Sequence, residues 1–161
     1  MKKYLTLLLG LVTFMFVFTA CDDDDDLPDV DITVNFENAV QADDGTLNVV
    51  KGNPISVTSI DVTNREAGKK AIATAAIYYL DGVRIGASVV SPLAFSFPTE
   101  NLPLGVYDFN IEVEILAVDK TPAFGVLGYK IKIVENATDI PGDQTPEEGV
   151  STTNHPDLHA K

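Results

Sequence analysis

Hydrophobic and polar residues alternate along much of the chain between residues 30 and 136. The clearest runs are 30–36, 107–115 and 129–133, in which every second residue is Val, Ile, Phe or Tyr. A period of two is that of an extended chain, because successive side chains point to opposite faces of a strand. Each run is therefore predicted to be a β-strand with one buried and one solvent-facing side.

Two further segments differ from this simple pattern. In residues 55–62 the apolar positions change phase near Ser59, which predicts a β-bulge there. Residues 72–80 are apolar or small in both phases, as expected of a central strand. A helix is the alternative for 72–80 because of its alanines, and Ile77, Tyr78 and Tyr79 favour the strand.

The remaining signals are turns and one short strand. Asp81-Gly82 favours a tight hairpin turn into residues 83–85, and Leu93, Phe95 and Phe97 indicate another strand. Together these segments give about seven short strands in about 100 residues, a spacing typical of an antiparallel sandwich. The fold class predicted from the pattern is all-β.

The last two long strands also predict a register. If 107–117 and 125–134 form a hairpin, Glu112 can face Lys132 while Glu114 faces Lys130. Opposite charges on opposed positions stabilise a sheet by roughly 0.2–1 kcal/mol each. The same register places Ile111 opposite Ile133 on the inner face.

Two motifs give a resemblance to a known class of domain. The stretch 102–109, with Gly105 and Tyr107, resembles the start of strand F in immunoglobulin-like bacterial surface domains, and 79–86 resembles their C–C′ hairpin. The resemblance implies an immunoglobulin-like antiparallel β-sandwich over residues 30–136, with the Tyr107 hydroxyl bonded to backbone. The chain departs from antibody domains because it has no cysteine pair and no tryptophan.

The N-terminus reads as a secretory leader. Lys2 and Lys3 precede an apolar stretch over 5–18, and small residues stand just before Cys21, the only cysteine. The apolar stretch is short for a retained transmembrane helix, which needs roughly 20 residues. Residues 1–20 are therefore predicted to be a signal peptide.

The segment Phe18-Thr19-Ala20-Cys21 resembles a bacterial lipobox. The resemblance implies cleavage before Cys21, a thioether-linked diacylglycerol on its sulfur, and a fatty acid such as palmitate on its new amino group. Several acyl chains at one residue give firm membrane anchoring, whereas one chain holds only marginally. A membrane is therefore an expected partner, to which the protein is attached by this N-terminal lipid.

Asp22, Asp23, Asp24, Asp25 and Asp26 follow the cysteine directly. Such a run is typical of a solvated tether, which is predicted to extend over residues 21–29. It also resembles the export signal that sends lipoproteins of Bacteroidota-type bacteria to the outer face of the outer membrane. The alternatives are an outer-membrane lipoprotein that faces the periplasm, and retention in the inner membrane.

Charge and composition limit the partners and the ordered part of the chain. Loss of the leader, with its two lysines, takes the formal charge from −13 to −15, so nucleic acid is not expected as a partner. Residues 137–161 are rich in Pro and Gly and poor in apolar residues. They are predicted to be a disordered tail beyond the domain at 30–136.

Candidate chemistry is sparse. Glu112 and Glu114 stand about 7 Å apart along a strand, a separation that glycosidases use, but a solvated face is expected for both. His155 and His159 have the spacing of two metal ligands on a helix, yet Pro156 lies between them in the expected tail. Asp43-Asp44 reads as a turn rather than a calcium loop. No catalytic residue, cofactor site or metal site is predicted.

The remaining candidate is Phe124, in an expected loop over 119–125, where an exposed phenylalanine would mark a contact patch. The sequence thus predicts a non-catalytic, lipid-anchored surface module that binds or scaffolds a protein or glycan, as an accessory to glycan uptake or to adhesion. The alternative is a structural subunit of an envelope complex that assembles through a sheet edge.

Overall fold

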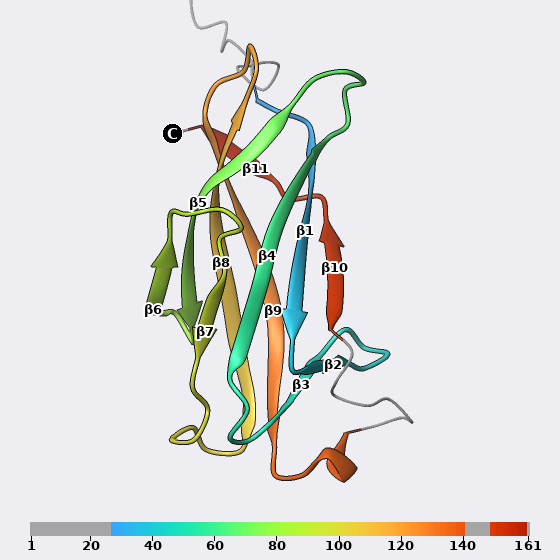
Figure 1. Ribbon diagram of the computed structural model, residues 1–161, viewed down its shortest axis with the longest axis vertical. Coiled ribbons are helices and arrows are strands. Elements are labelled where there is room, and N and C mark those ends of the chain that lie inside the picture. The colour runs from blue at the N-terminus through green and yellow to red at the C-terminus, as the bar shows by residue number, and fades with distance from the viewer. Residues whose placement is uncertain (1–26, 141–148, 161) are drawn as a thin grey trace, which may run out of the picture.

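The computed structural model describes residues 27–140 and 149–160, which form two packed β-sheets (Figure 1). The helical structure in these residues is a single short 3₁₀ turn, Ala137–Asp139. Within the same residues, no helix has the length and apolar character needed to cross a membrane.

Sheet A has four strands. In spatial order they are β10 (Val150–Asn154), β1 (Val30–Glu37), β4 (Ile55–Asn64) and β7 (Phe95–Phe97). Each neighbouring pair in this sheet is antiparallel.

Sheet B is the larger sheet. Its spatial order is β2 (Ala39–Gln41), β3 (Leu47–Val50), β9 (Ala123–Val134), β8 (Gly105–Ala117), β5 (Ala71–Leu80) and β6 (Val83–Ser88), and β11 (Leu158–Ala160) also pairs with β9. The order β9-β8-β5-β6 facing β1-β4-β7 is that of the GFCC′ and ABE sheets of an immunoglobulin-like sandwich. The predicted all-β sandwich is confirmed, but the described residues form eleven strands rather than about seven, and β3 pairs with β9 in parallel.

The core lies between the sheets and consists of the residues at the alternating apolar positions. Val30, Ile32 and Val34 on β1 are fully buried, as are Phe109 and Ile111 on β8. Aromatic rings fill its centre, where Tyr78 stacks on Phe95 with ring centroids 4.2 Å apart. The period of two therefore predicted the buried faces of β1, β8 and β9 correctly.

Two local predictions are also confirmed. Asn35 pairs with Ser59 and Phe36 with Val57, so Thr58 is the extra residue of a β-bulge beside Ser59. The segment 72–80 lies within strand β5, between β8 and β6, and not in a helix.

The hairpin turn from β5 to β6 has the expected conformation. Asp81 and Gly82 have φ of 48° and 76°, the left-handed region that a tight two-residue turn requires at both positions.

The structure contains the tyrosine hydrogen bond that the resemblance to strand F implied. The Tyr107 hydroxyl donates to the Pro103 carbonyl oxygen at 2.7 Å. This bond ties the start of β8 to the chain that leads into it, as in the tyrosine corner of immunoglobulin-like domains.

The predicted register of the β8–β9 hairpin is wrong. Lys132 faces Val106 rather than Glu112, a shift of six positions, and Lys130 faces Asp108, with which it forms an ion pair. An even shift keeps every side chain on its expected face, so the alternation alone could not detect it. The chain turns at residues 118–122, where Asp119 has φ 61°, and β9 begins at Ala123.

The predicted disorder of residues 137–161 is also wrong for the described part of that segment. Residues 150–154 form β10, which pairs with β1, and 158–160 form β11, which pairs with β9. The low apolar content suggested disorder, but an edge strand is held largely by main-chain hydrogen bonds, and Thr suits such a strand. Residues 141–148 and 161 lie outside the described residues.

Candidate functional site

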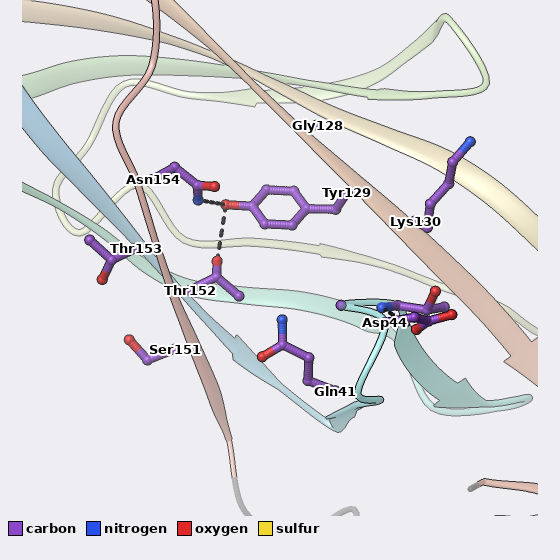
Figure 2. A pocket seen from close by; sticks show the side chains of 11 residues that line it. Gln41, Asp44, Gly128, Tyr129, Lys130, Ser151, Thr152, Thr153 and Asn154 are labelled. Carbon is purple, nitrogen blue, oxygen red and sulfur yellow. Dashed lines mark hydrogen bonds between the residues drawn. The ribbon is translucent and has the colours of Figure 1, made fainter.

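A polar groove of about 500 Å³ opens along one side of the sandwich, between β9 and β10 (Figure 2). Three segments line it: residues 128–130 of β9, residues 151–154 of β10, and the β2–β3 hairpin, from its last β2 residue, Gln41, through its turn. Most of the lining side chains carry a hydroxyl or an amide, namely Gln41, Thr46, Tyr129, Ser151, Thr152, Thr153 and Asn154.

The turn between β2 and β3 is fixed by its own hydrogen bonds. The Asp44 Oδ1 atom accepts a hydrogen bond from the Thr46 backbone N–H at 2.9 Å, and Gly45 has φ 84°. The hydrogen bond from Thr46 holds the pKa of the Asp44 carboxyl below its ordinary value of 3.8. Asp44 therefore places a carboxylate at one end of the groove at neutral pH.

Tyr129 joins the two walls of the groove. Its hydroxyl oxygen accepts hydrogen bonds from Thr152 Oγ1 and Asn154 Nδ2, each at 3.0 Å (Figure 2). Burial raises the pKa of the Tyr129 phenol, and the two hydrogen bonds only partly oppose this effect. The phenol is therefore neutral under physiological conditions and ties β9 of sheet B to β10 of sheet A.

The two glutamates singled out from sequence lie on the outer face of sheet B, not in the groove. Glu112 Oε2 accepts a hydrogen bond from the Tyr79 hydroxyl at 3.4 Å, and Glu114 Oε2 accepts one from Thr74 Oγ1 at 3.2 Å. The lysine partners expected for them lie elsewhere because of the register shift.

The two histidines are not brought together as a metal site. His155 Nδ1 lies 3.0 Å from the Val30 carbonyl oxygen and 3.6 Å from Asp31 Oδ1, whereas His159 is in β11, opposite Phe124. In the described ranges, no group of three or more His, Cys, Asp or Glu side chains could hold a metal ion.

Asp31 has a second partner beside His155. Arg65 Nε and Nη2 donate to its carboxylate at 2.8–3.1 Å, and the Arg65 hydrogen bond lowers the pKa of Asp31. These contacts fasten the ends of β1 and β4 to each other.

Phe124 does not occupy the loop in which it was expected. It is a half-buried residue of β9, paired with Glu114 on one side and with His159 on the other. The exposed apolar residue of that hairpin loop is Val118, which is 57% exposed. The prediction that Phe124 lies in a loop is therefore wrong, because strand β9 begins at Ala123, two residues earlier than expected.

The groove itself was not predicted. The wall formed by β9 depends on how β9 pairs with its neighbouring strands, which the sequence pattern did not predict correctly. The wall formed by β10 lies in a segment that was predicted from composition to be a disordered tail. Thr152 and Thr153, which are of a type enriched in strands, are the sequence signal for this wall.

Cys21 and the aspartates at 22–26 lie outside the described residues. In comparisons with known proteins, no family model matches the chain and no curated protein matches it significantly.

Proposed function

We propose that this protein is a non-catalytic binding module, held at the outer membrane by lipid on Cys21 and facing the cell surface, which binds a polar ligand in the groove between β9 and β10. The proposal rests on the groove because hydroxyl, amide and carboxylate groups from three segments converge there. Such a set of donors and acceptors suits the hydroxyl groups of a glycan. The role is accessory to glycan uptake or to adhesion.

The position of the groove supports a role away from the membrane. The chain enters the sandwich at Val30, and β1 runs from there to Glu37, where the β2–β3 hairpin follows (Figure 1). The groove includes the turn of that hairpin, so its far end lies at the opposite end of β1 from the tether. An extended tether over residues 21–29 would span roughly 30 Å.

The bonding of the acidic and imidazole groups supports a binding role rather than a chemical one. Glu112 and Glu114 accept hydrogen bonds from Tyr79 and Thr74, and His155 lies against the Val30 carbonyl. Each of these groups contributes to holding strands together.

The anchor is tested by a single substitution. Cys21→Ser is expected to abolish incorporation of labelled palmitate and to move the protein from the membrane fraction to the soluble fraction, because the thioether acceptor is lost. Protease treatment of intact cells should degrade the wild-type domain if it faces outward. A Cys21→Ser protein that still sediments with membranes would show that the anchor is not a lipid on this residue.

Ligand binding is tested by filling the groove. Gln41→Trp is expected to weaken binding of the mature protein to surface polysaccharides on a glycan array by about tenfold or more, because the Gln41 side chain lines the groove (Figure 2) and an indole there would occupy space that a ligand needs. Thr63→Trp is the matched control, because Thr63 is an exposed residue on the outer face of sheet A. Equal binding by both variants would rule out the groove as the glycan site.

A second candidate is assembly through a sheet edge. β6 is the last strand of sheet B, and Val83 in it is 65% exposed, while Val89 and Val90, just after it, are 74% and 72% exposed. Unpaired edge strands with apolar side chains tend to pair with another chain. If this edge is the functional one, the protein would act as a structural subunit of an envelope complex.

A further inference from the structure

Strand β9 has a gap in its pairing. One side of β9 is paired with β8 from Ala123 to Ile133. The other side is paired with β11 at residues 123–125 and with β3 at residues 131–134. Between them, residues 126–130 have no strand beside them on that side in the described part of the chain.

The gap and the groove coincide. Gly128, Tyr129 and Lys130 of the gap line the groove, and so do residues 151–154 of β10. β10 is the terminal strand of sheet A, so its side away from β1 is also unpaired among the described strands. The groove is thus bordered by two strands with vacant main-chain edges, one from each sheet.

The dimensions suit a short strand. Five residues of an extended chain span about 17 Å, which is the length of the row left vacant between β11 and β3. A peptide strand placed there would lie beside β9 between β11 and β3, on the side of β9 with which both of them pair.

We propose that this gap is a strand-insertion site for an extended peptide segment of a partner protein. In an extended strand, N–H and C=O groups of alternate residues point to the same side, so two or three residues of 126–130 present hydrogen-bonding groups to the vacancy. This mode of recognition, in which a peptide completes a sheet, obtains its affinity from main-chain bonds and its specificity from alternate side chains.

The lining sets the chemistry of the peptide. Side chains pointing toward Tyr129, Thr152 and Asn154 would meet hydroxyl and amide groups, which favours Ser, Thr or Asn at alternate positions. Asp44 at the end of the groove and the formal charge of −15 on the mature chain disfavour an acidic peptide. The occupant is therefore a neutral or basic, hydroxyl-rich strand.

This inference rests on the proposed binding role and names a peptide as a ligand. Its first test needs no ligand. In amide hydrogen exchange of the mature protein, alternate amides within 126–130 are expected to exchange at least about tenfold faster than those of 123–125 and 131–134. Uniform protection along β9 would overturn the proposal, because the ladder would then be complete.

The second test supplies the strand in cis. A ten-residue Gly/Ser linker, with a root-mean-square span of roughly 17 Å, is added at the C-terminus and followed by Thr-Lys-Thr-Lys-Thr. Tethering gives an effective concentration in the millimolar range, so weak insertion is detected. The matched control ends in Pro-Lys-Pro-Lys-Pro, which has the same charge but lacks three main-chain donors.

The fusion with threonine is expected to slow exchange of the fast amides within 126–130 by about tenfold, and the proline fusion is expected to leave them unchanged. Equal exchange in the two fusions, or protection that appears at β6 instead, would overturn the proposal. Glycan binding that is lost in Gln41→Trp, together with a negative exchange result, would leave the proposed function intact and remove only strand insertion.

Discussion

Phe109→Ala is expected to lower the free energy of unfolding of the mature protein by about 3–5 kcal/mol. Phe109 is fully buried on β8, and its ring centroid lies 6.3 Å from that of Phe36 and 6.2 Å from that of Tyr78. Phe36 belongs to sheet A, whereas Phe109 and Tyr78 belong to sheet B, so truncation leaves a cavity between the sheets that neither sheet can close alone.

Urea denaturation followed by circular dichroism measures this loss. The slope of the unfolding free energy against urea should be unchanged, so that the midpoint alone moves. Val83→Ala, at a position 65% exposed, is the control and should change stability by less than about 0.5 kcal/mol. A loss below about 1 kcal/mol for Phe109→Ala would contradict the central position of this ring in the core.

Ending the chain after Glu148 is expected to lower the free energy of unfolding by roughly 2–5 kcal/mol. The deletion removes β10 and β11, the buried Pro156, and the side chains of Val150 and Leu158 that pack against the core. It also exposes the edge of β1 that β10 covers.

A second readout of the deletion is the titration of Tyr129. Burial raises the pKa of this phenol in the full chain, and Thr152 and Asn154 cover its hydroxyl. Without β10 the phenol is more hydrated, so its pKa should fall toward the ordinary value of 10.0. The change is followed by the ultraviolet absorbance of tyrosinate as a function of pH.

A chain ending at Ala160 is the matched control for the deletion and should keep full stability. If the chain ending at Glu148 unfolds at the same urea concentration as the full chain, β10 and β11 are not integral to the domain. The groove would then lack a stable wall, and the proposed binding site would fail with it.

Much of the fold could be predicted because alternation reflects local geometry. Val30, Ile32 and Val34 are buried because an extended chain presents every second side chain to the same face, whatever its neighbours are. The bulge beside Ser59 and the turn at Asp81-Gly82 were predictable for the same reason, since each depends on a few adjacent residues.

The candidate site could not be predicted in this way. Its walls are residues 128–130 and 151–154, which lie in different sheets and far apart in the sequence. A short polar strand such as β10 carries too few apolar residues to show a period, and it forms because it pairs with β1.

The sequence by itself determined which residues of the long strands are buried, where the tight turns lie and that the fold is a sandwich, because side-chain alternation and turn conformation are local properties. Only the tertiary structure decided the β8–β9 register, the recruitment of the C-terminal segment as β10 and β11, and the gap beside residues 126–130. These features depend on which main-chain edges meet, and main-chain hydrogen bonds are the same for every residue type except proline.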